Sequence, residues 1–471
     1  MSTVSRREFM KTAGAAAVLG LTAGKTAGAQ AANPQDQRPN ILLIVADDLG
    51  YGDLSSYGAE DMETPAVDAL VDQGVRMDHF YANSTVCSPT RAALLTGKYQ
   101  EMVGVPGVIR TPPHNNWGYL SQDAMLVSDM FRGAGYHTAL IGKWHLGLEE
   151  ENHPNNRGFD YFHGWLGDMM DDYWEHRRHG INYLRRNHEE IDPEGHATEL
   201  FTDWAVDYLH ERAQADEPFF LFMSHFAPHF PIQPPEDWLE RVKDREPDID
   251  DTRAANVALI EHMDHEIGRL MDALEETGLA ENTLVVFTSD NGGSLPHGAS
   301  NGALRGGKQD MYEGGIRVPF AAAWPGVIEP GSQSDTVALT MDLVPTFCAA
   351  AGISIEHDID GVDILPSLVN GGTQSLDRDL FWVRREGGHR YMGLTIWAAR
   401  RGDWKLVKND HEAPFELFNL AEDPQETTDR SDQNRGIYNE LTEALRAHIQ
   451  RGGEVAWQKP GGREVDANWE S

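Results

Sequence analysis

The stretch Ile41-Leu42-Leu43-Ile44-Val45-Ala46-Asp47-Asp48 decides the fold class of this chain of 471 residues. Its apolar part, Ile41–Ala46, is uninterrupted, rich in β-branched side chains and bounded by polar residues. Such a run predicts a strand that is buried on both faces, as in a parallel or mixed sheet flanked by helices. Two further runs, 219–223 and 284–289, have the same character and predict two more strands of this kind.

Helical patterns separate these strands, at residues 65–73, 126–133, 199–212 and 253–277. The alternation predicts an α/β domain with a large mixed, mostly parallel sheet flanked by helices. After Asn370-Gly371-Gly372 the pattern changes to short strand-like runs and a helix from about residue 437 to 450. We therefore expect a large domain over residues 32–372 and a smaller C-terminal antiparallel sheet domain with a helix over 373–471.

The N-terminal residues 1–31 have the pattern of an export signal. Arg6-Arg7 precedes an Ala/Gly-rich apolar stretch, and small residues follow at positions 27–31. This order is typical of a twin-arginine signal with a cleavage site. Because the apolar stretch is short and interrupted by Lys25, we expect no stable membrane anchor. The mature protein is expected to be periplasmic or secreted.

The composition is strongly acidic, with 39 Lys and Arg against 75 Asp and Glu and a formal net charge of −36 at pH 7. Such a surface repels nucleic acid and anionic lipid, so we expect neither as a partner. The chain has two cysteines, Cys87 and Cys348, which are too few for a disulfide framework at this length. A single disulfide between them stays open for an exported protein.

Two of the predicted strands each end in a pair of oxygen-bearing side chains. Asp47-Asp48 follow the first strand, and Asp290-Asn291 follow the strand at 284–289. The carboxyl ends of strands line the ligand crevice of an open α/β sheet, and carboxylates that meet there repel one another unless a cation is present. Oxygen donors suit a hard ion such as Ca²⁺ or Mg²⁺ better than zinc. The sequence therefore predicts a metal site here, with Ca²⁺ preferred over Mg²⁺.

The segment Cys87-Ser88-Pro89-Thr90-Arg91 opens a predicted helix. Pro89 suits a first helical turn, residues 92–95 propagate a helix, and Gly97 can end it. Cys87 is thus expected at a helix N-terminus, where free N–H groups favour negative charge and Arg91 adds a cation. We interpret Cys87 as a reactive group in an anion-binding pocket. The competing interpretation is an ordinary small buried residue.

Three further segments carry cations or acid–base groups. In Gly142-Lys143-Trp144-His145 the lysine and the histidine are two residues apart, so they share a face of an extended strand. Pro228-His229-Phe230-Pro231 holds a histidine between two prolines that stiffen the backbone. Lys308 follows a glycine pair in Leu304-Arg305-Gly306-Gly307-Lys308. Two other histidines, His225 and His297, are close in sequence to these groups and stay unassigned.

Together, these motifs resemble those of a type I, formylglycine-dependent sulfatase of the alkaline phosphatase-like superfamily. The Cys87-x-Pro89-x-Arg91 element is the most specific of them. The resemblance extends from Pro39 to about Asp429 and includes Trp404-Lys405-Leu406-Val407 and Asp423-Pro424. Within the family, it is strongest toward arylsulfatases and carbohydrate sulfatases of the N-acetylgalactosamine-6-sulfatase kind.

The resemblance implies that a maturation enzyme oxidises Cys87 to formylglycine, whose hydrate attacks the sulfur of a sulfate monoester. It implies a metal held by Asp47, Asp48, residue 87, Asp290 and Asn291. It assigns charge stabilisation to Arg91, Lys143 and Lys308. It also implies that His229 or Lys308 protonates the leaving alcohol and that His145 then deprotonates the second hydroxyl of the hydrate.

The expected substrate is a sulfated small molecule, oligosaccharide or polysaccharide, and the region 164–196 is a candidate for binding it. This region offers aromatic residues for stacking on sugars (Trp165, Tyr173, Trp174 and Tyr183) and basic residues for anions (Arg177, Arg178, His179, Arg185 and Arg186). The alternative is that these are ordinary packing and surface residues. Two other functions stay open: a phosphomonoester or phosphonate ester hydrolase of the same superfamily, and a non-catalytic glycan-binding protein.

Overall fold

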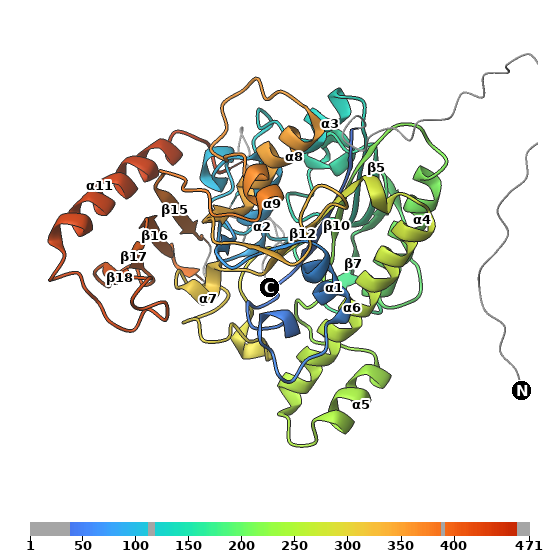
Figure 1. Ribbon diagram of the computed structural model, residues 1–471, viewed down its shortest axis with the longest axis horizontal. Helices are drawn as coiled ribbons and strands as arrows, with labels where there is room; N and C mark the ends of the chain where they lie inside the picture. The colour runs from blue at the N-terminus through green and yellow to red at the C-terminus, as the bar shows by residue number, and fades with distance from the viewer. Residues whose placement is uncertain (1–37, 112–117, 388–390, 459–471) are drawn as a thin grey trace, which may run out of the picture.

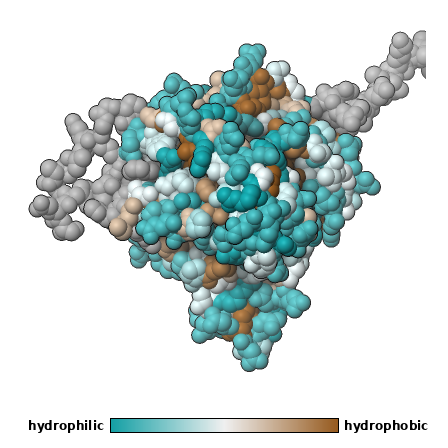
Figure 2. Space-filling model, turned by 90° about the vertical axis from the view of Figure 1, so that its left-hand side faces the viewer, coloured by the Kyte–Doolittle hydropathy of each residue, from teal (hydrophilic) through white to brown (hydrophobic). Residues whose placement is uncertain are grey.

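The computed structural model describes residues 38–111, 118–387 and 391–458 (Figure 1). The predicted export signal, residues 1–31, lies outside the described residues, so export and localisation stay predictions. Among the described helices, none is long and apolar enough to cross a membrane. The face shown in Figure 2 is largely hydrophilic, with hydrophobic side chains in small separate patches, as the acidic composition leads one to expect.

A ten-stranded sheet forms the centre of the molecule, and the first quoted stretch lies in its middle. β1 (Asn40–Ala46) pairs in parallel with β10 (Phe219–Ser224) on one side and β11 (Thr283–Ser289) on the other. Beyond β10 the parallel order continues through β4 (His137–Lys143) and β5 (Tyr161–Trp165). These pairings confirm the three buried strands that the sequence predicts.

The edges of the sheet are mixed. On the β11 side, β12 (Phe320–Ala323) and β2 (Val75–Met77) pair antiparallel, and β13 (Ser332–Ser334) then pairs in parallel. On the β5 side, β8 (Leu184–Arg186) and β9 (Glu189–Glu190) add two antiparallel strands. Two small sheets lie apart, β3 (Phe80–Tyr81) with β14 (Ala338–Leu339) and β6 (Arg177–Arg178) with β7 (Ile181–Asn182). The predicted large mixed sheet is thus confirmed.

Alternate side chains of β1 enter two different cores, one on each face of the sheet. Ile41 and Val45 pack with residues of α2 (Cys87–Thr96), α3 (Val127–Gly133), α8 (Leu343–Ala351) and α9 (Leu365–Asn370). Leu42 and Ile44 pack with α1 (Pro65–Gln73), α4 (Ala197–Arg212), α5 (Glu236–Arg245) and α6 (Asp251–Glu276). Helices therefore cover both faces, which explains why the strand is apolar at every position (Figure 1).

The C-terminal part forms a four-stranded antiparallel sheet with one helix, as predicted. Its strands are β15 (Leu380–Arg385), β16 (Thr395–Arg401), β17 (Trp404–Lys408) and β18 (Glu416–Asn419). Helix α11 (Arg435–Gly452) packs Leu441 and Leu445 against one face. The other face packs Trp382 against Tyr81 of the large domain. The boundary at residue 372 stays a prediction.

A buried ion-pair group joins this sheet to the large domain. Lys405 of β17 lies 2.8 Å from Glu313 of α7 (Glu313–Ile316) and 2.8 Å from Glu426. Glu313 also accepts a hydrogen bond of 2.7 Å from the Tyr81 hydroxyl. All three charged residues are shielded from solvent. We call Glu313, Lys405 and Glu426 the junction cluster.

Candidate active site

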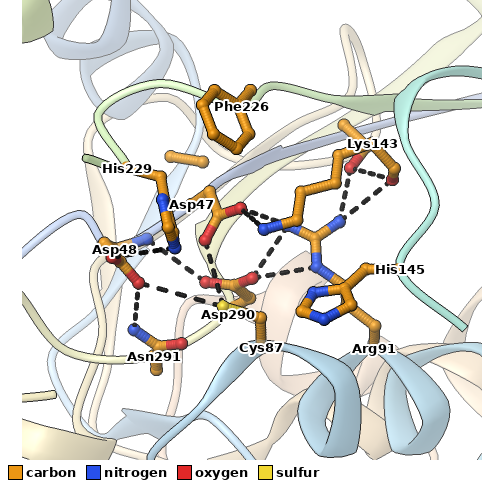
Figure 3. Close-up of polar contacts among 12 residues, drawn as sticks. Asp47, Asp48, Cys87, Arg91, Lys143, His145, Phe226, His229, Asp290 and Asn291 are labelled. Carbon is orange, nitrogen blue, oxygen red and sulfur yellow. Dashed lines mark hydrogen bonds and ion pairs between the residues drawn. The ribbon is translucent and has the colours of Figure 1, made fainter. Parts of the chain in front are cut away.

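The paired polar residues after β1 and β11 lie side by side, as predicted from their strand ends (Figure 3). Ala46 pairs with Ser289 at the ends of the two parallel strands, which places Asp47-Asp48 beside Asp290-Asn291. Asp48 adopts a left-handed backbone with φ of 70°. Its carboxylate therefore lies close to that of Asp47 instead of on the opposite face, as a regular strand would place it.

Cys87 is the first residue of helix α2, which runs to Thr96 and ends at Gly97 with φ of 67°. Its Sγ lies 3.2 Å from Asp47 Oδ1 and 3.9 Å from Asp48 Oδ1. Both Cys87 and Cys348 are buried free thiols, so the alternative of a disulfide between them is wrong. Burial and the carboxylates of Asp290 and Asp47 raise the pKa of the Cys87 thiol well above its ordinary value.

Three cations balance the three carboxylates. Arg91 contacts Asp290 Oδ2 through Nε at 2.9 Å and through Nη2 at 2.8 Å. Lys143 forms an ion pair with Asp47, and Lys308 lies 2.7 Å from Asp48. Burial disfavours the charge of Asp47, but Lys143 and the other nearby cations outweigh it and lower the pKa of this carboxyl. We call these six charged residues the catalytic cluster.

The donor set of this site fits a divalent cation. Asp47, Asp48, Cys87 and His229 each present a ligand atom, and these atoms lie within 4.8 Å of one another. The Asn291 amide nitrogen donates to Asp48 Oδ1 at 2.9 Å, while its buried Oδ1 has no hydrogen-bond partner. A buried amide oxygen without a partner is costly unless a ligand takes it up. The hard donors of this group are the carboxylate oxygens of Asp47 and Asp48 and the free amide oxygen of Asn291, which suit a hard ion.

His145 is set up to accept a proton. β4 ends at Lys143, and His145 has a left-handed φ of 60°, so the two residues reach the site from a turn and not along one strand face as expected. The Nε2 of His145 lies 2.8 Å from the Ile109 carbonyl, so this nitrogen carries the proton. Its Nδ1 has no partner. Burial and the cations Lys143 and Arg91 hold the pKa of His145 well below its ordinary value.

His229 faces the same site from the loop after β10. Its Nε2 lies 3.7 Å from Asp48 Oδ2, and its Nδ1 lies 2.7 Å from the Phe230 carbonyl. The Phe230 ring stacks between the rings of His229 and His297, with centroids 4.8 and 4.5 Å away. Burial, with the charge of Lys308, lowers the pKa of His229 to about 4. His297, which the sequence left unassigned, thus stacks on Phe230 beside His229, whereas His225 is fully buried.

Some supporting residues have no signal in the sequence. Ser224 accepts a 2.6 Å hydrogen bond from Arg91 Nη1. The Tyr173 hydroxyl donates to the His229 carbonyl at 2.8 Å, and Lys143 Nζ lies 5.2 Å from the centroid of the Phe226 ring. These residues fix the cations and His229 in place. The apolar sequence of β10 gives no indication that its last residue, Ser224, will bind Arg91.

The sequence matches two family models along most of its described length. Residues 39–353 match the Sulfatase family, and residues 307–452 match the family described as N-sulphoglucosamine sulphohydrolase, C-terminal. The chain belongs to the sulfatase family. It is a sulfuric ester hydrolase, as the resemblance of its motifs predicts.

Several relatives of this sulfatase are similar over most of their length. It is 33% identical to N-acetylgalactosamine-6-sulfatase of Homo sapiens over 394 residues, which are 78% of this chain and 71% of that protein. It is 33% identical to arylsulfatase A of Homo sapiens, over 87% of this chain and 86% of that protein. The crystal structure of Ps i-CgsB in complex with k-i-k-neocarrahexaose superposes with a TM-score of 0.82 at 30% identity, covering 89% of this chain and 95% of that one.

A cavity of about 330 Å³ gives this sulfatase its access to the site. Cys87, His145, His229 and Lys308 all line it. From the region 164–196, four residues line this cavity: Asp168, Met169, Arg178 and His179. Trp165 and Tyr173 are instead fully buried in the core, so the expectation that they stack on sugars is wrong.

Proposed function

We propose that this sulfatase hydrolyses sulfate monoesters of carbohydrates, with a formylglycine made from Cys87 and a bound divalent cation, Ca²⁺ in preference to Mg²⁺. One observation carries the proposal. Cys87 opens helix α2 beside two carboxylates and shares a cavity with His145, His229 and Lys308. The preference for Ca²⁺ follows from the protein oxygens gathered from several residues, because Mg²⁺ keeps more of its water.

The thiol of Cys87 is a poor nucleophile where it lies. Its raised pKa keeps it protonated, and a protonated thiol attacks slowly. Oxidation by a maturation enzyme, which supplies the oxidant, removes the sulfur and leaves an aldehyde on the same carbon. The hydrated aldehyde then presents two hydroxyl groups near the carboxylates of Asp47 and Asp48.

The first step forms a bond between one hydrate oxygen and the sulfur, and breaks the bond from sulfur to the leaving alcohol. Asp47, Asp48, Asp290 and Asn291 would hold the cation, which supplies positive charge that favours an anionic nucleophile and offsets the charge of the ester. Arg91, Lys143 and Lys308 stabilise the charge that develops on the sulfate oxygens. His229 or Lys308 gives the leaving oxygen its proton. Burial lowers the pKa of Lys308, but the charge of Asp48 outweighs burial and raises it, so this lysine carries its proton. His229 has to take up a proton first, because its pKa is lowered to about 4.

The second step regenerates the aldehyde. His145 Nδ1, which has no partner in the protein, accepts the proton of the remaining hydroxyl. The electron pair re-forms the carbonyl, the bond from carbon to the sulfated oxygen breaks, and sulfate leaves. The neutral state of His145 and the contact of its Nε2 with Ile109 support this role.

The proposal for a carbohydrate substrate is supported by the names of the relatives and by the saccharide in the complex of Ps i-CgsB. A phosphate ester has the same tetrahedral shape as a sulfate ester. The test therefore compares the hydrolysis rates of a sulfate ester and a phosphate ester of the same alcohol. We expect faster hydrolysis of the sulfate ester. A faster phosphate ester contradicts the proposal.

Mass spectrometry of the peptide that contains residue 87 tests the modification directly. We expect an aldehyde in active enzyme, and the peptide with Cys348 serves as the control that keeps its thiol. Active enzyme with an intact thiol at residue 87 contradicts the mechanism. Sulfate release without any aldehyde would do the same.

A further inference from the structure

Lys308 of the catalytic cluster lies in a tight turn formed by residues 307–310. The Asp310 N–H donates to the Gly307 carbonyl at 2.9 Å, which closes the turn, and Lys308 is its second residue. The third residue, Gln309, has a left-handed φ of 84°. A residue other than glycine adopts this conformation only at a cost in free energy, so the turn depends on support from its surroundings.

The large domain supports this turn through its backbone. The Lys308 N–H donates to the Gly293 carbonyl at 2.9 Å. The Gln309 N–H donates to the Thr85 carbonyl, also at 2.9 Å. Gly293 lies in the segment that follows β11, and Thr85 lies two residues before Cys87. These bonds place the turn between the segment with the candidate metal ligands and the segment with the candidate nucleophile.

The C-terminal sheet supports the same turn through a side-chain amide. Asn409 follows β17, and its Nδ2 donates to Asp310 Oδ1 at 2.9 Å. Its Oδ1 accepts a hydrogen bond of 2.6 Å from the Met311 N–H. The other carboxylate oxygen of Asp310, Oδ2, accepts a hydrogen bond of 3.0 Å from the Gly307 N–H. One amide therefore fixes the carboxylate that ties the two ends of the turn together.

Arg384 of β15 contacts the turn at a second position. Its Nη1 donates to the Gln309 carbonyl at 3.3 Å. Its Nε lies 3.1 Å from Glu386 Oε1, and both side chains are almost fully buried, so the guanidinium is held in place. The C-terminal sheet thus contacts the turn from two of its strands, through Arg384 and through Asn409.

We propose that Asn409 is a positioning residue for Lys308 and acts through Asp310. The amide holds the Asp310 carboxylate, the carboxylate holds the turn, and the turn sets the place of Lys308 Nζ, 2.7 Å from Asp48. Asn409 lies outside the lining of the cavity, so it affects the reaction through this turn and not by contact with the ester. The inference rests on the proposed function, in which Lys308 acts on the sulfate group, and it gives the C-terminal sheet a part in sulfate release.

The carboxylate and the amide can be exchanged without the loss of a hydrogen bond. Asn409→Asp alone places two carboxylates against each other, and Asp310→Asn alone places two amide NH2 groups against each other. When both changes are combined, the amide on residue 310 accepts from Gly307 and donates to the carboxylate on residue 409, which also accepts from Met311. Asn409→Ala removes both side-chain hydrogen bonds and adds no charge.

The substrates are p-nitrophenyl sulfate and N-acetylgalactosamine 6-sulfate. Each single variant should lower kcat about 10- to 100-fold, with a much smaller change in KM, because Lys308 acts on charge that develops in the transition state. The combined variant should recover kcat to within about threefold of the wild type. Lys408→Met is the matched control: Lys408 precedes Asn409 but lies over the rings of Trp397 and Phe415, so kcat should not change.

All variants are compared at equal aldehyde content at residue 87 and at a temperature well below their unfolding midpoints. Calorimetric binding of inorganic sulfate, the product, gives a second measurement that needs no turnover. Its affinity should fall in the single variants and return in the combined variant. Lys308→Met shows the loss of affinity that complete removal of the amine produces.

Wild-type kcat in Asn409→Ala would overturn the inference. A combined variant with the wild-type midpoint and the kcat of the single variants would also overturn it. The same would follow from a loss of kcat that Lys408→Met shares, because Asn409 would then have a purely structural role. Failure of the wild type to hydrolyse either substrate, with sulfate affinity still lost and restored as described, would instead contradict the proposed function.

Discussion

Two groups of buried charges in this molecule have similar chemistry and different purposes. The catalytic cluster sets three carboxylates against three cations at the end of the central sheet. The junction cluster sets Glu313 and Glu426 against Lys405 where the C-terminal sheet meets the large domain. All of these residues are buried except Lys308, whose side chain is 11% exposed.

The two clusters differ in whether they reach a cavity and in whether nearby polar atoms remain available to a ligand. Lys308 of the catalytic cluster lines a cavity together with Cys87, His145 and His229, and two polar atoms near the cluster, Asn291 Oδ1 and His145 Nδ1, have no hydrogen-bond partner.

In the junction cluster, Lys405 contacts both carboxylates, so Glu426 Oε1, which accepts no hydrogen bond, still has a cation at 2.8 Å, and Glu313 has a further partner in Tyr81. None of these three residues lines the cavity. Buried charge therefore does not by itself mark a site. Polar atoms left for a ligand, together with a cavity, do so.

Replacement of Cys87 by alanine should have the largest effect on sulfate release. Loss of the nucleophile should reduce sulfate release on the order of 10³-fold or more, while the thermal unfolding midpoint stays close to that of the wild type. Cys348→Ala is the control. Cys348 lies on α8 and packs in the hydrophobic core, so the variant should keep the activity of the wild type. Residual activity near that of the wild type in Cys87→Ala would remove the basis of the proposed mechanism.

In the junction cluster, replacement of Lys405 by methionine should have the largest effect on the free energy of unfolding. It leaves Glu313 and Glu426 buried without their shared cation, which should lower the free energy of unfolding by about 3–5 kcal/mol in urea titrations. Lys408→Met, at the end of the same strand and half-buried, should change it far less. A loss below about 1 kcal/mol would show that the junction does not depend on this ion pair.

Removal of the metal should affect the catalytic cluster and leave the junction cluster unchanged. Chelation should abolish sulfate release and lower the unfolding midpoint, and Ca²⁺ at a hundredfold excess over its Kd should restore about 2.7 kcal/mol. Lys405→Met should keep this response to Ca²⁺, whereas Asp47→Asn should lose most of it. An identical midpoint with and without chelator in the wild type would exclude a stabilising metal.

The smallest expected effect is a change in the free energy of unfolding with pH, caused by Glu426 of the junction cluster. Burial, together with Glu313, raises the pKa of Glu426 from its ordinary value of 4.5 to about 7. The folded state thus binds more protons in this window, so the free energy of unfolding should fall as pH rises from about 4.5 to about 7. Glu426→Gln cannot ionise and should show a smaller fall in urea titrations on either side of the window. An equal fall would assign the dependence to other groups.

Much of the fold follows from local patterns. The strands β1, β10 and β11 are apolar throughout because helices cover both faces, and this signal needs no knowledge of their partners. Strands β8 and β9 lie in a region whose sequence shows no period, because they are short, polar and at the edge of the sheet. Their pairing depends on β5, which a local pattern cannot show.

The site was predictable where a motif fixes both residue and backbone. The helix after Cys87 and the two strand ends are of this kind, while the roles of their residues stay predictions. Trp165 and Tyr173 show the limit, since an aromatic residue among basic ones looks the same in sequence whether it is buried or exposed. Arg110 and Arg384 are 274 positions apart, and their meeting at Glu386 depends on how the loop that holds Arg110 packs against the C-terminal sheet.

The cavity takes its lining from both parts of the chain. Cys87, His145, His229 and Lys308 come from the large domain, whereas Arg384 comes from β15 of the C-terminal sheet. A change in the C-terminal sheet can therefore alter the lining of this cavity and leave Cys87, His145, His229 and Lys308 unchanged. Because Lys405 of this sheet is buried against Glu313 of the large domain, any such change has to preserve the junction cluster.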